Sequence, residues 1–586
     1  MWWAGCLLLV LGVCSNAEHG VFKAKPGAQF EHMSVDRTTG QIYVGAVNQL
    51  YQLDQDLNIL NLVQSEEMGS SWMNNHNKAL LINYINLTLI TCGSLTGNTT
   101  KNFRPGIATR SLEPDRMFRI LFNNNQLGTR MFVNFNNQAL FIINYVYGFA
   151  SQGFSYFLTT QRKTYWVSSP YISKLVRICH NDSKYYSYTE IPITCHSKDG
   201  KQYNLVQTGF VGKPGSNLAK TLTVSTEDDV LFAVFSTSSE SNRPGNNSAL
   251  CVYSLASIRH TFTDNIRACY SGLGNQGLDF LYGVKACEKI TTTIDDDFCG
   301  QSYNYPIGGE QSVEAYTAIQ FNVRATAVTA TSTGNDTVVF IGTQNGHLKK
   351  IIQENISHAF EYADVKIDPG VAVNADIHLE PNGTYLYVLT EQRLSKVKVQ
   401  ECHLFKTCWE CLTRKDPYCG GWCTLENKCS PRSDCKDPDS WISYQSWTNP
   451  TIDGMVPSSR EILVAFNTRK QLSVKLRNIF QQCIANIGFY CQFTIDRKKW
   501  NVKATLLGEM INCESTHFYH TLRLSNINAS IAVIWGRSKT SLNNPDNVHV
   551  NIYSCQDLAK KPSASCEHTT TPWSVWSGRR PRPVRG

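Results

Sequence analysis

Cysteines are the residues with the clearest chemistry in this sequence, and seven of them fall in one segment of 34 residues: Cys402, Cys408, Cys411, Cys419, Cys423, Cys429 and Cys435. Thiols at such spacing can form disulfides, bind zinc or act in redox exchange, and the Cys408-x-x-Cys411 spacing fits each of these. So short a segment cannot bury enough apolar surface to fold alone, and crosslinks can replace that surface. The large number and irregular spacing of the cysteines favour disulfides over the zinc and redox alternatives.

The start of the chain predicts export, which favours the same interpretation because secreted proteins keep their disulfides. Residues 1–17 have the features of a signal peptide, with an apolar run at Cys6–Val13 and small residues at Ser15–Ala17. The run is shorter than the roughly 20 apolar residues of a membrane anchor, and no later stretch reaches that length. Cleavage would remove Cys6 and Cys14 and leave nineteen cysteines, so at least one is unpaired or pairs between molecules.

Glycosylation motifs and charge fit an extracellular protein. We predict N-glycosylation at Asn86, Asn98, Asn181, Asn246, Asn335, Asn355, Asn382 and Asn528. Charged residues make up 17% of the chain, and the net charge of +8 is not gathered in one long basic stripe. We therefore expect no nucleic-acid partner.

A strand–turn–strand theme recurs from about residue 28 to residue 400. It occurs at Gln41–Leu53, at Thr337–Ile352 with Asn345-Gly346 as the hairpin turn, and at Thr384–Val399. Shorter examples are Asp229–Phe235 and the pair Ala79–Ile82 and Leu89–Cys92. Such units favour a β-propeller, although no WD or kelch signature is present, and one large or several small β-sandwiches are the alternative.

Several segments resemble the extracellular region of plexins. The segments similar to the plexin sema domain are Phe30–Asp36, Gly40–Leu53, Ser173–Cys179, Tyr186–Cys195, Tyr203–Gln207, Ala249–Leu255 and Ala268–Gly272. Ile294–Gly300 and Asn304–Gly309 look like the A-type plexins in particular, and Cys419-Gly-Gly-Trp-Cys423 resembles the centre of a plexin–semaphorin–integrin (PSI) module.

The resemblance implies an all-β architecture: a seven-bladed sema propeller, a small disulfide-rich PSI module and an immunoglobulin-like IPT (also called TIG) domain. The expected boundaries are 18–400 for the propeller, 401–448 for the PSI module and 449–554 for the IPT domain. Residues 555–586 look like the truncated start of a second PSI module followed by a disordered tail with Arg579, Arg580, Arg582 and Arg585. Short alternating strands after residue 450 without the Cys–Trp–Cys core of a true immunoglobulin domain favour a receptor over a semaphorin ligand.

The family's pairing implies the disulfides Cys179–Cys299, Cys195–Cys251, Cys269–Cys287, Cys402–Cys419, Cys411–Cys429, Cys423–Cys435 and Cys491–Cys513. The chain departs from the family between Ser65 and Ser168, where the sema region is shorter and two family disulfides have no counterpart. Cys92 lacks its usual neighbour, and the pairing of Cys555 and Cys566 is open. The eighth PSI cysteine is also missing, while Cys483 is extra, so we predict a Cys408–Cys483 bridge.

Catalysis and metal binding are the alternatives to a binding function. Asp295-Asp296-Asp297 could coordinate a cation, but an acidic turn before Cys299 is favoured because no calcium-binding loop pattern follows. The 14 histidines show no metal-ligand spacing, and no motif has the paired carboxylates of a sialidase-like propeller enzyme. We expect no enzymatic activity, no metal and no cofactor.

The function implied by the resemblance is that of a plexin-like semaphorin receptor ectodomain, with semaphorins as protein partners, with or without a co-receptor. The membrane span and cytoplasmic region of a plexin have no counterpart here, so we expect binding without signalling. Membrane contact would then come only through regions missing from this chain. The expected location is outside the cell, secreted or on the plasma membrane as part of a longer receptor. The alternatives are a secreted semaphorin-like ligand or decoy and a scatter-factor-type receptor ectodomain.

Overall fold

The structure, a computed structural model, describes the chain from residue 18 to residue 553 with gaps. The described ranges are 18–64, 74–84, 88–96, 107–111, 119–121, 141, 143–182, 184–240, 242–282, 285–423, 426–436, 438, 441–445, 451–456, 461–465, 468–477, 488–495, 498–518, 526–535, 540–541 and 549–553. The predicted signal peptide and the arginine-rich tail lie outside them. The chain divides into two units, one reaching to Glu401 and including Asp416–Tyr418, the other formed by Cys402–Lys415 and the chain from Cys419 onward.

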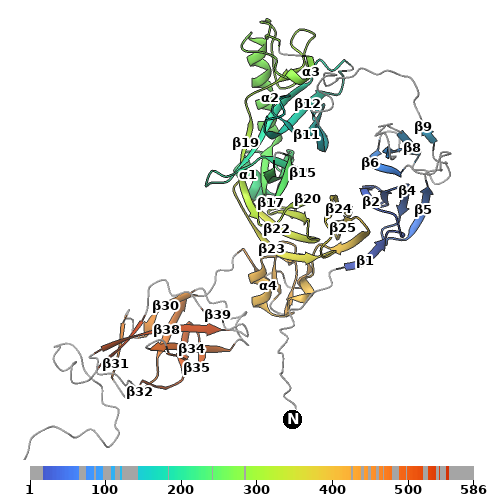
Figure 1. Ribbon diagram of the computed structural model, residues 1–586. Coiled ribbons are helices and arrows are strands. Elements are labelled where there is room, and N and C mark those ends of the chain that lie inside the picture. Colours follow the sequence, from blue (N-terminus) through green and yellow to red (C-terminus); the bar gives the residue numbers. More distant parts are fainter. Residues whose placement is uncertain are drawn as a thin grey trace, which may run out of the picture. The chain divides into compact units, whose positions relative to one another are not determined.

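The first unit is built from sheets that follow one another as propeller blades (Figure 1). Four of them are antiparallel four-stranded sheets, and two further blades are joined into one ten-stranded sheet because β13 pairs in parallel with β19. The first two blades are β2 (Phe30–Val35), β3 (Ile42–Ala46), β4 (Gln49–Leu53) and β5 (Ile59–Gln64), then β6 (Asn74–Asn83), β7 (Thr88–Thr96), β8 (Ile107–Ser111) and β9 (Arg119–Leu121). The next two are β10 (Asn144–Ser151), β11 (Phe154–Arg162), β12 (Tyr171–Cys179) and β13 (Thr189–His196), then β15 (Leu205–Gly212), β16 (Val230–Glu240), β17 (Arg243–Ser254) and β19 (Val313–Phe321).

The last two blades are β20 (Ala325–Ser332), β21 (Thr337–Thr343), β22 (His347–Asn355) and β23 (His358–Lys366), then β24 (Val373–Leu379), β25 (Tyr385–Thr390) and β26 (Arg393–Lys398) with β1 (Glu18–Lys23). The short strands β14 (Gln202–Tyr203) and β18 (Ile307–Gly308) pair with β13. The helices are α1 (Ser216–Leu222), α2 (Leu255–Tyr270) and α3 (Asp279–Tyr282). The described strands thus form six blades, and a seventh, which the resemblance implies, is not among them.

The strand–turn–strand prediction is confirmed at each quoted segment. Residues at Thr337–Thr343 are buried throughout, which explains the continuous apolar run in the sequence, and the strand pairs in register with β22. Gly346 closes their hairpin with φ of +80°, and a Cβ there would lie 1.8 Å from the carbonyl oxygen of Asp368. A glycine is therefore required at the hairpin turn that the Asn345-Gly346 pair predicts.

The N-terminal strand β1 completes the blade formed by β24, β25 and β26. It pairs antiparallel with β26, with Phe22 opposite Leu394. Buried residues of the first blade and of this closing blade share one apolar cluster, which includes Tyr51, Tyr387 and Leu394. Lys396 adds polar contacts across the same junction, since its Nζ lies 2.8 Å from the carbonyl oxygen of Gln55.

The inner strands of the same two blades, β2 and β24, are joined by a carboxylate and two histidines. Asp376 Oδ2 accepts a hydrogen bond from Met33 N at 2.9 Å and lies 2.9 Å from His32 Nδ1, while His378 Nε2 lies 3.0 Å from the carbonyl oxygen of Met33. Burial works to raise the pKa of Asp376, but the His32 contact and the Met33 amide keep this pKa below its usual value. Burial lowers the pKa of His378, so His378 stays neutral and can donate to Met33.

The second unit begins with the cysteine-rich module. Its elements are the 3₁₀ turns η2 (Cys402–Leu404) and η3 (Arg432–Asp434), α4 (Cys408–Arg414), β27 (Gly421–Cys423), β28 (Lys428–Cys429) and β29 (Trp441–Ser443). The strands form one small sheet in the order β28-β27-β29. Thr407 Oγ1 caps α4 by accepting from Glu410 N.

The IPT region follows, with a nine-stranded sheet and a separate two-stranded sheet among its described residues. Its strands are β30 (Thr451–Val456), β31 (Glu461–Ala465), β32 (Thr468–Lys470), β33 (Ser473–Arg477), β34 (Phe489–Ile495), β35 (Lys498–Leu507), β36 (Met510–Cys513), β37 (Thr516–Phe518), β38 (Asn526–Trp535), β39 (Thr540–Ser541) and β40 (His549–Tyr553). The main sheet order is β30-β33-β36-β35-β34-β38-β40-β31, and β32 pairs separately with β37. Alternating residues such as Phe489, Cys491 and Phe493 are buried, as the period of two in the sequence predicts.

The contacts between β2 and β24 predict an acid-sensitive fold. As pH falls below 6.5, the ordinary pKa of histidine, the unfolded chain takes up a proton at His378 before the folded chain does, so the free energy of unfolding decreases. His378→Gln keeps a donor but removes this titration, and we expect a shallower loss of stability between pH 7.5 and 5. Urea unfolding at several pH values measures it, with His260→Gln, at a side chain 65% exposed, as the control. Equal pH dependence in the native chain and His378→Gln would contradict the assignment.

Candidate interaction surface

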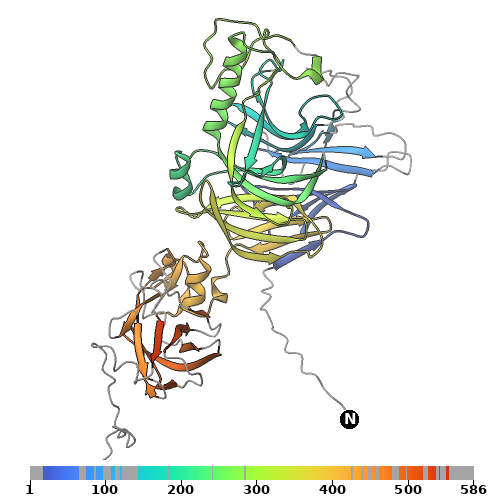
Figure 2. The same cartoon turned by 60° about the vertical axis from the view of Figure 1, so that its left-hand side comes forward.

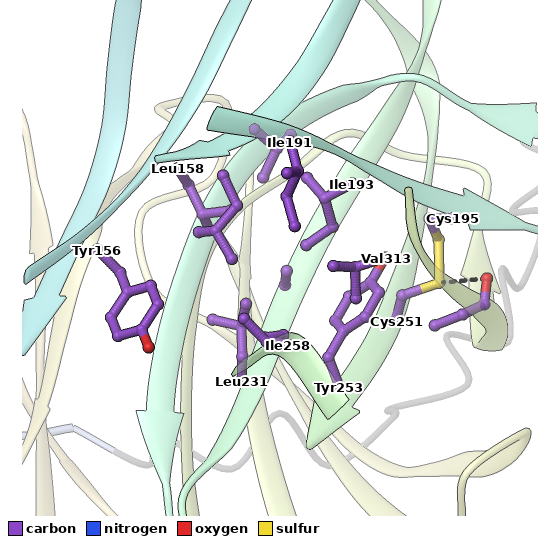
Figure 3. Packing of buried hydrophobic residues seen from close by; sticks show 14 of the residues in the cluster. Tyr156, Leu158, Ile191, Ile193, Cys195, Leu231, Cys251, Tyr253, Ile258 and Val313 are labelled. Atoms are coloured by element: carbon purple, nitrogen blue, oxygen red, sulfur yellow. Dashed lines mark hydrogen bonds between the residues drawn. A yellow bond between two sulfur atoms is a disulfide. The ribbon is translucent and has the colours of Figure 1, made fainter. Parts of the chain in front are cut away.

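The chain segment between β17 and β19 carries the helices α2 and α3 (green in Figures 1 and 2). Ser254 Oγ caps α2 by accepting from Ser257 N at 3.1 Å. Leu255, Ile258 and Phe262 of this helix are buried in the apolar cluster between the β10–β13 blade and the β15–β19 blade. Figure 3 shows that cluster with the Cys195–Cys251 disulfide at its margin. The insertion is thereby seated on two blades.

Disulfides hold the remainder of the insertion. Cys179 at the end of β12 is bonded to Cys299, and Cys269 at the end of α2 is bonded to Cys287. The other described disulfides are Cys195–Cys251, Cys402–Cys419, Cys411–Cys429, Cys423–Cys435 and Cys491–Cys513. These are the pairs that the resemblance implies, and their formation in the secreted protein stays a prediction for peptide mapping.

The acidic turn Asp295–Asp297 binds side chains of α2. Arg259 donates to Asp297 Oδ1 at 2.5 Å and to the carbonyl oxygen of Asp296 at 3.2 Å. Thr263 Oγ1 donates to Asp296 Oδ1 at 2.5 Å. The turn therefore fastens the chain before Cys299 to the helix, and the described residues contain no cluster of three His, Cys, Asp or Glu suited to a metal ion.

A buried arginine lies beneath this turn. Arg177 is 1% exposed, and its guanidinium carbon lies 4.4 Å from the ring centre of Phe154 and 4.9 Å from that of Phe262. Burial lowers the pKa of this guanidinium. The faces of the two rings stabilise the cation, which joins β12 to α2.

A buried polar network lies on the β10–β13 blade near α3. The Glu190 carboxylate is fully buried, forms an ion pair with Lys174, and accepts from Gln161 Nε2 at 2.9 Å and from the Tyr188 hydroxyl at 3.1 Å. Burial and the Glu190 charge raise the pKa of Tyr188 well above its usual value, so its hydroxyl remains a donor. The network satisfies a charge that would otherwise be costly inside the protein.

The turn between β11 and β12 presents two large apolar side chains to solvent. We call residues 163–170 the aromatic loop. Trp166 is 61% exposed and Val167 is 62% exposed. Tyr165, in contrast, packs on the cluster that contains Leu278 and Phe280 of the α3 region. The aromatic loop is thus an apolar surface on a supported base.

Hydrogen bonds across the aromatic loop fix its shape. Lys163 N donates to the carbonyl oxygen of Pro170 at 2.9 Å, Ser169 N to that of Trp166 at 3.0 Å, and Thr164 N to Ser169 Oγ at 3.0 Å. A turn held in this way keeps its exposed side chains in place, which reduces the entropy lost when a partner binds. This surface is the candidate interaction site of the propeller.

The sequence did not reveal this site. The aromatic loop, α2 and α3 were not predicted, and of their surroundings only the cysteines, the acidic turn and segments that resemble the plexin sema domain, such as Ala268–Gly272, were singled out. The signal that could have found the loop is the triplet Tyr165-Trp166-Val167 between two apolar strands, where turn residues are usually polar.

The predicted glycosylation sites lie at different depths. Asn181, Asn246, Asn335 and Asn382 are exposed, and Asn355 is half-buried. Asn86 and Asn98, and the side chain of Asn528, lie outside what the structure describes. Occupancy at all eight sites stays a prediction.

Among the described residues of the cysteine-rich module, Trp422 is the largest buried apolar side chain, 3% exposed. Both glycines before it are required by geometry, since Gly420 has φ of +68° and a Cβ at Gly421 would lie 2.1 Å from the carbonyl oxygen of Ile442. Cys408 is also disulfide-bonded, but its predicted partner Cys483 lies outside the described residues. Cys92, Cys555 and Cys566 likewise remain without a described pairing.

Comparison with known proteins gives the same domain order. Residues 206–377 match the sema domain family, residues 401–450 the plexin repeat (PSI) and residues 460–553 the TIG domain found in plexin. Plexin-A2 of Mus musculus is 31% identical over 522 residues, covering 73% of this chain and 27% of the relative. Plexin-A4 of Homo sapiens is 32% identical over 517 residues, covering 72% and 27%. The chain therefore spans about a quarter of the length of these relatives.

Solved structures share the fold. The full extracellular region of Plexin A4 (domains 1 to 8) aligns with a TM-score of 0.63 at 23% identity, covering 91% of this chain and 76% of that chain. Drosophila Plexin A in complex with Semaphorin 1b aligns with a TM-score of 0.53 at 15% identity, covering 72% and 94%.

The domains and their order define a plexin-type extracellular region built on a sema domain. This chain is a plexin-like extracellular region of the A type, with sema, PSI and TIG domains. Within the described ranges, no helix has the length and apolarity needed to cross a bilayer. The boundaries 18–400, 401–448, 449–554 and 555–586 remain predictions.

The burial of Trp422 predicts the stability of the cysteine-rich module. Trp422→Ala should lower the free energy of unfolding by about 3–5 kcal/mol because it removes a large buried side chain and leaves a cavity. Leu404→Ala, at a side chain 39% exposed in the same module, is the control and should cost much less. Denaturant unfolding measures both, and equal effects would show that Trp422 is not the core of the module.

The cysteine-rich module also carries the prediction of a disulfide bridge between Cys408 and Cys483. Non-reducing peptide mapping of the secreted chain should recover these two cysteines in one crosslinked peptide. Recovery of Cys408 joined to any other cysteine would refute the pair.

Proposed function

We propose that this chain is the recognition part of a plexin-like receptor and that it binds semaphorins through its propeller. The observation that carries the proposal is the order of the matches, a sema domain followed by a plexin repeat and by a TIG domain of the plexin type. The TIG match favours a receptor over a semaphorin-like ligand. One of the similar solved structures is Plexin A of Drosophila in complex with Semaphorin 1b, and that pairing supports the choice of partner.

The aromatic loop is the proposed contact surface. Exposed tryptophan on a rigid support supplies a large contact area at a low cost in side-chain entropy, and such residues often dominate binding energy at protein interfaces. Trp166 and Val167 together meet this description. Loops on a rigid β scaffold are also where binding residues concentrate. The proposed location is outside the cell, secreted or displayed as part of a longer receptor, where a semaphorin could reach the loop.

The test is binding of the secreted chain to a panel of semaphorin ectodomains by biolayer interferometry. We expect at least one semaphorin to bind. Trp166→Ala should weaken that complex about thirtyfold or more, as truncation of a hot-spot residue does. Ile356→Ala, at an exposed apolar side chain on the turn after β22, is the matched control and should leave affinity unchanged.

The outcomes separate the receptor assignment from the choice of surface. If no semaphorin in the panel binds, the proposed function is wrong. If a semaphorin binds equally well to native chain and to Trp166→Ala, the function stands and the aromatic loop is not its contact surface.

A further inference from the structure

Arg177 is a buried cation of the propeller whose N–H groups lack acceptors. The residue is 1% exposed, and its Nε and Nη1 are buried without a hydrogen-bond partner among the residues that the structure describes. A guanidinium carries five N–H donors and keeps its charge at physiological pH. Because buried polar groups are nearly always paired, unpaired donors of this kind indicate a water molecule or an ion as their acceptor.

The aromatic rings around Arg177 stabilise its charge without satisfying these donors. The ring centres of Phe154 and Phe262 lie 4.4 Å and 4.9 Å from the guanidinium carbon. A ring attracts the cation electrostatically, but it is only a weak hydrogen-bond acceptor. The N–H groups therefore still need an oxygen or a halide.

Tyr156 (labelled in Figure 3) adds a hydroxyl at the same place. It pairs directly with Arg177 in the β11–β12 ladder, so the two side chains project from the same face of the blade. The side chain is fully buried, and within the described part of the chain its hydroxyl has no hydrogen-bond partner. Burial raises the pKa of Tyr156, so the hydroxyl keeps its proton and can donate. Two neighbouring side chains thus offer donors in one buried site.

The charges near Arg177 do not compensate it. Arg259 is the second cation of the site, and it already forms an ion pair with Asp297. Asp296 attracts Arg177, but no carboxylate of the described residues forms an ion pair with Arg177. Burial, with a smaller contribution from Arg259, keeps the pKa of Arg177 below its usual value in spite of Tyr156 and Asp296. One buried positive charge is therefore left to be compensated, which is costly inside a protein.

We propose that Arg177 and Tyr156 bind a small monovalent anion and that chloride, abundant outside cells, is the natural ligand. One negative charge compensates one guanidinium, whereas a divalent oxyanion such as sulfate would leave an excess of buried negative charge. A water molecule fits less well, because it brings no charge and adds two donors of its own to a site that is short of acceptors. The bound anion would fasten β12 beneath α2. The proposal does not depend on semaphorin binding, so the two can fail separately.

The experiment is thermal unfolding of the secreted native chain in sodium chloride, sodium bromide and sodium gluconate at equal ionic strength, with gluconate as an anion too large for a buried site. The variants are Arg177→Met, which keeps an apolar side chain of similar length, and Tyr156→Phe, which keeps the ring and removes the hydroxyl. Arg37→Met and Tyr303→Phe, at exposed side chains of the same propeller, are the matched controls. Crystals grown in bromide locate the ion by its anomalous scattering.

Chloride and bromide should raise the unfolding temperature of the native chain and of both controls by about 2–4 °C over gluconate, because a ligand that binds only the folded state stabilises it. Arg177→Met should lose this dependence on the anion. Tyr156→Phe should need about fivefold more chloride for the same rise, since one hydrogen bond to the anion is lost. The crystals should show bromide beside the Arg177 guanidinium.

Three results would overturn the proposal. The first is an equal unfolding temperature of the native chain in chloride and in gluconate. The second is a chloride dependence that persists in Arg177→Met, and the third is water or the Asp296 carboxylate, in place of bromide, at the guanidinium in the crystals. If Arg177→Met does not fold, Tyr156→Phe and the bromide crystals still decide between an anion and its alternatives.

Discussion

Closure of the propeller by β1 is the constraint on which the first unit depends. A ring of sheets that ended with β26 would leave one strand edge with unpaired backbone groups, and such edges favour aggregation. β1 supplies the missing hydrogen bonds although more than 360 residues separate it from β26 in sequence. The apolar cluster shared by the first and last blades, the Lys396 contacts and the Asp376 contacts all lie at this junction.

The insertion between β17 and β19 shows how a loop-rich region becomes a rigid base. Apolar residues of α2 pack in the cluster between two blades. Charged residues of the insertion bind one another, as Arg259 binds the acidic turn Asp295–Asp297. The buried Glu190 and Arg177 are each stabilised by several partners, hydrogen-bond donors in the first case and aromatic rings in the second. These interactions let the neighbouring aromatic loop expose apolar side chains without losing its conformation.

The second unit uses different means of stabilisation in its two parts. The cysteine-rich module has a small core around Trp422 and depends on its disulfides, whereas the IPT region buries alternate residues of long strands. That alternation leaves the other face of each strand to solvent, and in β35 this face carries lysines. Fold and surface charge are therefore separated on the same strand by its period of two.

The sequence alone determined the all-β class, the cysteine-rich module and the strand pairs, because these depend on local patterns. Asn345-Gly346 marks a hairpin through glycine's access to positive φ, and alternation in residues 489–495 marks a half-buried strand. Only the tertiary structure decided that β1 completes the last blade, that Asp295–Asp297 binds Arg259 and Thr263, and that Trp166 stays exposed while Tyr165 is packed. Each of these depends on which distant segments meet in space. The local sequence does not show whether a carboxylate binds an arginine or faces solvent, nor whether a tryptophan is exposed or buried.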